Sequence, residues 1–236
     1  MRNWFIYNGK STKDFGVYIS GLNTYNAPER DVDVISVDGR NGDLLIDNGR
    51  YKNIDVVYPA FIYDEFSANI EGFRNFLLTQ IGYKRLEDTY HPEEYRMARV
   101  KGELSVGAVE TLEAGQFDIT FDCKPQRFLK SGEHPIEVTE ATQINNPTYN
   151  AAKPLLYVYG DGVFHIGDYD VEVEEHEYEY MIIDCDMMDA YYETHNLNGY
   201  ISLGGKGFPQ LETGVHGITM DNTISKIIVV PRWYII

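Results

Sequence analysis

Short extended runs separated by tight-turn signals recur along the chain, and they constrain the fold more than any other feature. Trp4-Tyr7 is followed by Asn8-Gly9, the dipeptide that most favours a two-residue β-hairpin turn. Gln116–Cys123 alternates apolar and polar residues, which is typical of a strand with one buried face. Aromatic residues make up 14% of the chain and include 19 Tyr, a composition that favours strands. The sequence therefore predicts a mainly β protein.

The first half contains further extended runs with turns between them. Gly39–Asp43 and Asp47–Arg50 combine Gly, Asn and Asp, so we predict a turn at each. Pro59 lacks a backbone N–H and is best placed on a sheet edge. The extended runs are Phe15–Ile19, Val32–Val37, Leu44–Ile46 and Tyr51–Tyr63.

One segment has helical spacing. Apolar residues recur three and four positions apart from Phe66 to Ile81, which predicts one amphipathic helix over 66–81. We expect Asp64 or Ser67 to cap its start and Gly82 to follow its end. The apolar face consists of Phe66, Ile70, Phe73, Phe76, Leu77 and Ile81, and the first five of these are predicted to pack in a core.

The charge distribution indicates two domains. Residues 1–130 carry 16 basic and 20 acidic side chains, whereas residues 131–236 carry 4 and 17. The polar stretch Lys130–Pro135 separates these parts, so we predict domains at 1–132 and 133–236. The second part is strand and turn throughout, which suggests a β-sandwich or jelly roll.

Net charge and hydropathy exclude several function classes. The formal net charge of -17 argues against gripping nucleic-acid phosphates or an anionic membrane surface. The longest aliphatic run, Ile227–Val230, is far shorter than a membrane helix requires. The N-terminal residues lack the apolar core of a signal peptide, so we expect synthesis in a cytoplasm without export by a cleavable signal.

No motif assigns catalytic, cofactor-binding or metal-binding residues, and we expect no enzyme and no cofactor. Cys123 and Cys185 are expected to be free, largely buried thiols. The acidic run Glu172–Glu179 is expected to be a solvated edge, with a weak calcium site as the alternative. Asp184-Cys185-Asp186 follows a strand and is interpreted as a loop. With so many carboxylates, a glycosidase pair stays open, but nothing selects two of them.

Several segments, in order and spacing, resemble the distal tail proteins (Dit) of siphophages. The resemblance extends over nearly the whole chain. The segments that carry it are Phe5–Ser11, Asp14–Gly21, Ala27–Arg30, Gly39–Leu44, Tyr90–Arg96, Phe121–Phe128, Asn146–Pro154 and Pro231–Trp233.

The resemblance implies a structural virion protein of phages that infect Gram-positive bacteria. Its N-terminal domain would be β-sandwich-like with one helix and would form a hexameric ring, and its C-terminal domain would be galectin-like. The ring would stand at the tip of a long non-contractile tail and join the tail tube to the tail-associated (Tal) spike or baseplate. Receptor-binding proteins are further implied partners, and assembly would take place in the host cytoplasm.

Two other function classes stay open, a carbohydrate-binding module for host adsorption and a hydrolase. The galectin sugar motif, His-x-Asn-Pro-Arg followed by Trp, does not occur in the second part. Stacked aromatic residues on an exposed face would favour the carbohydrate-binding alternative. In a ring, Arg40, Arg50, Arg96 and Arg99 would be available to pair with carboxylates of a neighbouring copy or, equally well, of their own chain.

Overall fold

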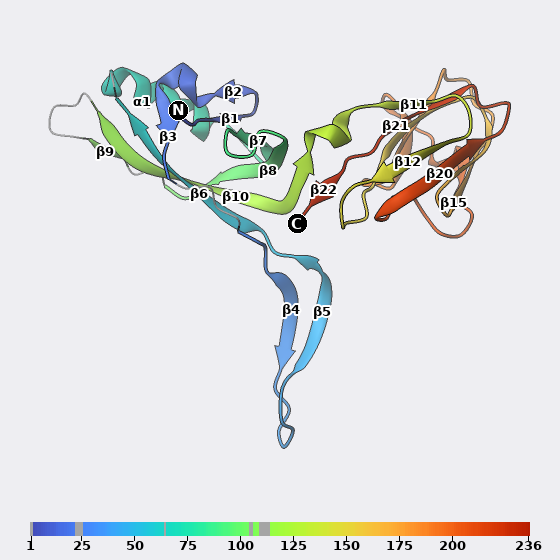
Figure 1. Cartoon of the computed structure of the whole chain (residues 1–236), viewed down its shortest axis with the longest axis horizontal. Helices are drawn as coiled ribbons and strands as arrows, with labels where there is room; N and C mark the ends of the chain where they lie inside the picture. Colours follow the sequence, from blue (N-terminus) through green and yellow to red (C-terminus); the bar gives the residue numbers. More distant parts are fainter. Residues whose placement is uncertain (1, 22–25, 64, 104–105, 109–113) are drawn as a thin grey trace. The chain divides into compact units, whose positions relative to one another are not determined.

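The chain divides into two compact units in the computed structural model, which describes residues 2–21, 26–63, 65–103, 106–108 and 114–236. Residues 1–127 with 236 form the first unit, and residues 128–235 form the second (Figure 1). Antiparallel strands dominate both, and α1 (Phe66–Leu78) is the one α-helix of the described residues. The predicted mainly β fold with one helix is confirmed. None of the described helices has the length and apolar character needed to cross a membrane.

The first unit contains most of a nine-stranded sheet, of which β22 and the last two residues of β10 belong to the second unit. Its main strand order is β2-β1-β7-β8-β10-β6-β3, and β9 and β22 pair with β10. Asn3 bridges Ile19, which joins the start of β1 to β3 and curls the sheet back on itself. The bounds are β1 Phe5–Tyr7, β2 Lys10–Ser11, β3 Val17–Ile19, β6 Ile54–Ile62, β7 Lys84–Asp88, β8 Glu94–Lys101, β9 Val106–Ala108, β10 Gly115–Leu129 and β22 Tyr234–Ile235, with a short 3-10 helix η1 at Thr12–Phe15.

Helix α1 buries an aromatic face against this sheet. Phe73 is fully buried, and its ring centroid lies 5.6 Å from Phe15 and 6.1 Å from Phe117. The helix ends at Leu78, so the predicted end at 81 is wrong, and Ile81, which lies beyond the helix, is 86% exposed. Glu65 occupies the N-cap with left-handed backbone and no side-chain cap bond.

The expected caps of α1 are therefore not used as predicted. Ser67 lies inside the first turn of the helix. Asp64, the other expected cap, lies outside the described residues. Gly82 has the left-handed φ of 75° that suits a glycine, but it follows Thr79, the actual C-cap, by three positions. The apolar periodicity located the helix, whereas its ends depend on backbone conformations that several residue types tolerate.

Local strand signals are confirmed at two places and corrected at a third. Asn8 and Gly9 both have positive φ and close the β1–β2 hairpin, in which Tyr7 pairs with Lys10. Along β10, Phe117, Ile119, Phe121 and Cys123 are all buried. Pro59 lies in the interior strand β6, between β10 and β3, and not on the predicted sheet edge.

Pro59 is tolerated in β6 because the neighbouring strand ends beside it. Its carbonyl accepts the N–H of Ser20, one residue beyond β3. In an antiparallel sheet the N–H and C=O of one residue point to the same neighbouring strand. The missing N–H of Pro59 therefore faces the end of β3, where pairing stops and no donor is needed.

The second unit consists of two antiparallel sheets around one apolar core. The six-stranded sheet has the order β11-β21-β13-β16-β17-β18, and the five-stranded sheet has the order β12-β20-β14-β15-β19. Both sheets contribute to the core, for example through Leu156 and Phe164. The bounds are β11 Ile136–Val138, β12 Thr142–Asn146, β13 Leu155–Tyr159, β14 Gly162–Ile166, β15 Tyr169–Val173, β16 Met181–Asp184, β17 Asp189–Tyr192, β18 His195–Asn196, β19 Ile201–Ser202, β20 Gly214–Met220 and β21 Lys226–Val230.

The domain boundary proposed from the sequence, after residue 132, falls inside this second unit. Strand β10 runs on through Lys124-Pro125, where the sequence suggested an end. Gly132, in the 3-10 helix η2 (Lys130–Glu133), accepts the N–H of Arg232 through its carbonyl. A Cβ at Gly132 would lie 2.3 Å from the backbone nitrogen of Trp233. This close backbone contact ties residues 130–133 to the end of the second unit.

Candidate assembly surface

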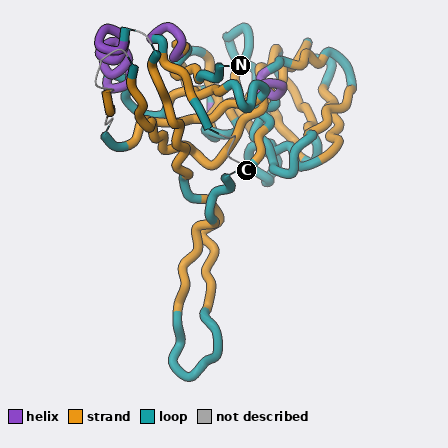
Figure 2. The backbone as a smooth tube through the Cα atoms, turned by 60° about the vertical axis from the view of Figure 1, so that its left-hand side comes forward, coloured by secondary structure: helices purple, strands orange, loops and turns teal. Residues whose placement is uncertain are grey.

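A two-stranded arm extends from the sheet of the first unit. It consists of β4 (Arg30–Ile35) and β5 (Leu44–Tyr51), which among the described strands pair only with each other (Figure 1). The predicted turn at Gly39–Asp43 forms its tip, seen as the teal loop in Figure 2. Every residue from 33 to 50 is exposed, so this part of the arm packs against nothing else in the described chain.

The second predicted turn of this region, at Asp47–Arg50, is wrong. The register passes from Arg30 opposite Tyr51 to Val32 opposite Asp47, so β5 carries the extra residues of a bulge there. Gly49 has φ 71° and donates its N–H to the Asp47 carboxylate at 2.8 Å. A bulge and a turn both use an Asp side chain that accepts the N–H of the residue two positions onward, together with a left-handed glycine. The residue pattern at 47–50 therefore does not distinguish them.

Ion pairs fix the register at the base of the arm. Arg30 contacts Asp47 at 2.8 Å and lies over the Tyr51 ring, and Arg50 contacts Asp31 at 2.7 Å. Hydrogen bonds from the Arg30 guanidinium lower the pKa of Asp47 from its usual value. Apart from Asp31, whose side chain is 14% exposed, these charged groups are solvent-exposed, so the pairs position the strands and contribute little stability.

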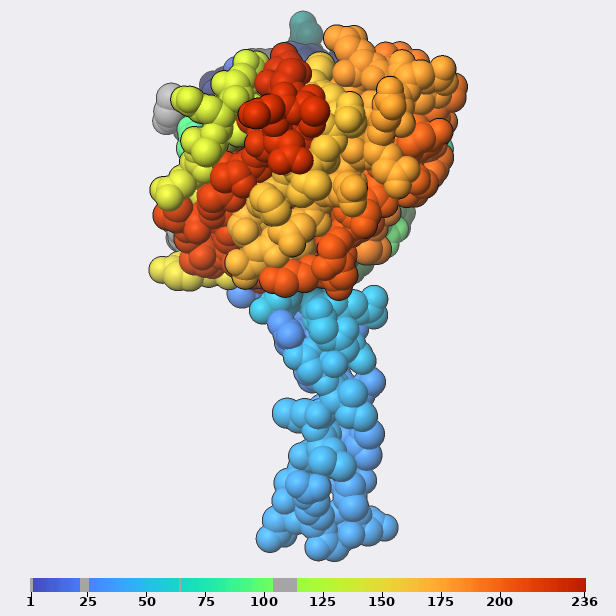
Figure 3. Space-filling view, turned by 90° about the vertical axis from the view of Figure 1, so that its right-hand side faces the viewer, coloured from blue at the N-terminus to red at the C-terminus, as the bar shows by residue number. Residues whose placement is uncertain are grey.

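Toward the tip the arm carries aliphatic side chains on both faces. Val34 lies opposite Leu45, and the two are 59% and 67% exposed. Because side chains alternate along a strand, the neighbouring pair Ile35 and Leu44 points to the other face, together with Ile46. Figure 3 shows this segment as a narrow column of exposed side chains. An exposed apolar ribbon of this kind is typical of a protein–protein contact.

The first unit has a second apolar surface on the outer face of β6. Alternate residues of that strand, Val57, Pro59 and Phe61, point away from the core, and Val57 is 46% exposed. The Phe61 ring lies 4.7 Å from Tyr63 and 6.0 Å from Tyr18. These side chains form a second patch of apolar and aromatic residues on the first unit.

The four arginines proposed for ring contacts are largely accounted for within the chain. Arg50 pairs with Asp31 in the arm, and Arg99 contacts Asp122 at 2.7 Å. Arg96 is half-buried, and this burial lowers its pKa from the usual value. Arg40 is exposed in the tip of the arm, and the paired side chains of Arg50 and Arg99 remain 77% and 52% exposed.

Asp184 is structural, as the loop interpretation of its segment requires. It ends β16, accepts the N–H groups of Asp186 and Met187, and receives two bonds from Arg232 at 2.7 and 2.9 Å. Burial alone would raise the pKa of Asp184, but the Arg232 guanidinium and these N–H groups hold it below its usual value. A carboxylate engaged on both oxygens is poorly placed for acid–base chemistry.

The remaining sequence candidates lie apart from one another. Cys123 and Cys185 are buried and free, as predicted, and burial raises the pKa of each thiol to about 12. The glutamates of the run Glu172–Glu179 are exposed, although Glu172 and Val173 pair with β19 rather than forming a free edge. Across the described ranges no three His, Cys, Asp or Glu side chains gather as a metal site.

Comparison with known proteins returns structures but no sequence relatives. No protein-family profile matches the chain, and no curated protein matches it. The SPP1 Dit protein, described as a paradigm of the hub adsorption apparatus of phages infecting Gram-positive bacteria, matches with a TM-score of 0.72. The match covers 99% of each chain at 11% identity. This chain has the Dit fold.

A second match comes from a larger assembly. A chain of the phage P2 baseplate in its activated conformation with calcium matches with a TM-score of 0.53, over 97% of each chain and at 11% identity. The same baseplate activated with strontium matches with a TM-score of 0.52. Both units of this chain are therefore found in one order in a tail hub and in a baseplate.

Proposed function

We propose that the protein is a structural virion protein that forms the hub at the distal end of a long, non-contractile phage tail. The observation that carries this proposal is the end-to-end match with SPP1 Dit, which covers both units in one alignment. A fold alone does not define a function. The free apolar arm supplies independent support, because a protein acting as a monomer gains nothing from leaving it uncovered.

The hub is proposed to be a ring of six identical chains, the number that the Dit resemblance implies. A closed ring of one chain requires head-to-tail contacts, so each copy must present two different, complementary surfaces. The arm is one such surface and the outer face of β6 is the other. Because the arm is apolar on both faces, we place it between its neighbour and a further layer of the tail.

The proposed partners follow from this position. One side of the ring would contact the tail tube protein, and the other would contact the tail-associated spike or the baseplate, including receptor-binding proteins. The role is structural rather than catalytic, which agrees with the internal engagement of Asp184 by Arg232. Assembly would occur in the host cytoplasm and the final location would be the virion tail tip.

The test is the oligomeric state of the full chain and of arm variants. Light scattering after size exclusion, together with negative-stain imaging, should show rings for the natural sequence. Leu45→Asp should weaken each contact by about 2 kcal/mol, roughly 30-fold in dissociation constant, because a buried Leu contributes about that much. Val57→Asp should act in the same direction from the other side of the contact.

Val215→Asp is the matched control. Val215 is 63% exposed, close to the 67% of Leu45, but lies on β20 in the second unit. Rings should persist in this variant. A monomeric natural chain at high concentration, or rings unaffected by Leu45→Asp, would contradict the assignment of the arm as the ring contact.

A further inference from the structure

The two sheets of the second unit differ in the side chains that they turn outward. In the five-stranded sheet, buried apolar residues alternate with exposed ones that are mostly polar, such as His165, Asp170 and Thr219. Antiparallel sheets with one face in water show this alternation. In the six-stranded sheet, β13 has the sequence Leu-Leu-Tyr-Val-Tyr and β21 has the sequence Lys-Ile-Ile-Val-Val. Such continuous apolar runs are the pattern of strands that are covered on both faces.

The pairing register gathers the outward side chains of the six-stranded sheet into one block. Tyr157 of β13 lies between Ile228 of β21 and Ile182 of β16, and Ile182 in turn lies opposite Tyr191 of β17. Because alternate residues such as Leu156 are buried in the core, these four side chains point outward, where each is partly exposed. Figure 3 shows β11, β21 and β13 side by side on the surface, in lime, red and gold. The outward block is called here the tyrosine face, and it consists of Leu155, Tyr157, Tyr159, Ile182, Tyr191 and Ile228.

Ring contacts hold the tyrosines of this face in place. The ring of Tyr180, just before β16, has its centroid 5.9 Å from that of Tyr157 and 5.2 Å from that of Tyr159. The ammonium group of Lys226 lies 4.5 Å from the centre of the Tyr159 ring. Side chains that are already ordered lose little entropy when a partner covers them. Tyrosine is also enriched among the residues that carry most of the binding energy at protein interfaces.

The size of the tyrosine face limits what covers it. Its four strands lie about 4.8 Å apart and the residues of β13 rise about 3.4 Å each, so the face measures about 15 Å in both directions. A standard protein interface buries about 800 Å² on each partner, which is more than a face of this size offers. A helix of about ten residues is about 15 Å long and about 10 Å wide. The dimensions therefore favour a single helix over a second globular chain.

The surroundings of the tyrosine face are acidic. Residues 131–236 carry 17 acidic and 4 basic side chains. Lys226 begins β21 and contacts Glu137 at 3.9 Å, and Arg232 follows β21 and contacts Asp184 at 2.7 Å. Both basic groups beside this strand are thus balanced by carboxylates of the same unit. The remaining negative charge attracts a cationic partner and repels a second copy of the unit.

We propose that the tyrosine face docks a basic amphipathic helix of another protein. The apolar side of that helix covers the face, and its Lys or Arg side chains reach the acidic surroundings. The first unit contains the same kind of layer, since α1 packs its aromatic side on a sheet. The surface lies in a different unit from the arm and β6, so the inference goes beyond the tail-hub role and does not depend on it.

The test is a titration of the full chain into a fluorescently labelled peptide, measured by anisotropy. The probe has about 14 residues of Leu and Lys, with Leu three and four positions apart, so that it folds as an amphipathic helix of sufficient length. It should bind with a dissociation constant in the micromolar range. Two comparison peptides should bind about tenfold more weakly, because neither presents both an apolar side and a cationic one. One has the same composition in a non-helical order, and the other has Glu in place of Lys.

Substitutions in the face identify the site of binding. Tyr157→Thr and Ile228→Thr keep residues that favour strands, and each should weaken binding by about tenfold, as truncation of a central interface residue does. Glu137→Lys changes a side chain that is 59% exposed and should weaken binding about threefold at low salt and less at high salt. Tyr149→Thr and Val215→Thr are the matched controls, since these residues are 94% and 63% exposed elsewhere in the same unit. Both controls should bind as the natural chain does.

Hydrogen–deuterium exchange of the natural chain gives a readout that does not depend on any variant. The helical peptide should slow exchange in β13, β16 and β21. Lack of binding, equal binding of the reordered peptide, tighter binding of the Glu peptide, unchanged affinity in both face variants, or protection confined to other strands would each overturn the proposal. Leu45→Asp in the arm should bind the peptide as the natural chain does, so the loss of ring contacts and the loss of peptide binding are distinguishable.

Discussion

Truncation of Phe73 to Ala tests how the one helix is held on the sheet of the first unit. The Phe73 side chain is fully buried, and its ring contacts the rings of Phe15 and Phe117. Removing about 150 Å² of buried ring at about 25 cal/mol/Å² costs about 4 kcal/mol. That value agrees with the 3–5 kcal/mol typical of buried Phe-to-Ala substitutions, which include the cavity left behind.

The assay is urea unfolding of the full chain, monitored by tryptophan fluorescence. Trp4 lies in the first unit and Trp233 in the second, so each unit contains one fluorescent reporter. With a urea dependence of about 2 kcal/mol/M, the midpoint of the first unit should fall by about 2 M. Leu78→Ala is the control in the same helix, since Leu78 is 72% exposed, and it should change stability by less than about 0.5 kcal/mol. Equal midpoints for the two variants would refute the packing described for α1.

Two further predictions concern buried polar and sulfur groups. Because the folded pKa of Asp184 is lowered, its stabilising contribution is complete above the unfolded pKa of about 3.9 and is lost as pH falls through the folded value. Asp184→Asn should therefore lower the free energy of unfolding by about 2 kcal/mol at pH 7, measured by urea unfolding, and by progressively less in acid. A loss of stability that does not depend on pH would be inconsistent with the pairing of Asp184 and Arg232. In the folded chain, Cys123 and Cys185 should resist a thiol-reactive dye at pH 8, because thiols with a pKa of about 12 carry almost no thiolate. Both should react with the dye after denaturation. Rapid labelling of the folded chain would show that the thiols are accessible.

Local rules predicted the elements whose causes are local. The Asn8-Gly9 turn depends on two residues that tolerate positive φ, and the buried face of β10 depends on simple alternation. The α1 face followed from helical spacing up to Leu77, beyond which the continued apolar pattern at Ile81 misled the prediction. An apolar residue at the right spacing indicates a buried face only while the helix continues.

Long-range pairing limited the remaining predictions. Only a Gly-Asp-Gly turn separates Leu155–Tyr159 from Val163–Ile166, a pattern typical of a hairpin, but β13 and β14 belong to different sheets. The turn carries the chain from one sheet to the other instead of closing a hairpin. Residue pattern alone does not distinguish these two outcomes, because both use the same glycine-rich connection.

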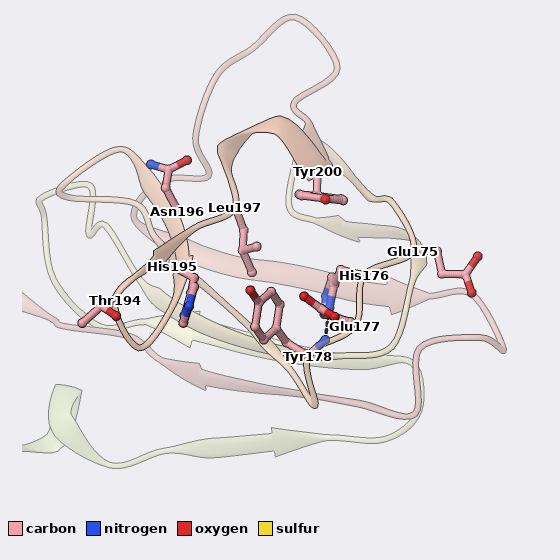
Figure 4. A pocket seen from close by; sticks show the side chains of 9 residues that line it. All are labelled: Glu175, His176, Glu177, Tyr178, Thr194, His195, Asn196, Leu197 and Tyr200. Carbon is pink, nitrogen blue, oxygen red and sulfur yellow. Dashed lines mark hydrogen bonds between the residues drawn. The ribbon is translucent and has the colours of Figure 1, made fainter.

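The candidate surfaces were hidden from the sequence for the same reason. Val34 and Ile35 have the pattern of an ordinary half-buried strand, and only the fold reveals that nothing in the described chain covers them. A hollow on the surface of the second unit is lined by Tyr178 and Tyr200 from separate segments (Figure 4), and the glutamate run beside them suggested only a solvated edge. A composition rich in tyrosine was consistent with a binding surface but gave no location for it.

The charge pattern bears on how such a ring would be held together. Arg50 and Arg99 are already paired with Asp31 and Asp122 of their own chain. The second part carries 17 acidic against 4 basic side chains, and six copies of it in close contact would repel one another. Residues 1–130, with 20 acidic and 16 basic side chains, pack with far less repulsion. An apolar arm from that part supplies attraction that salt does not screen, so we expect ring stability to survive salt concentrations at which charge-based contacts weaken.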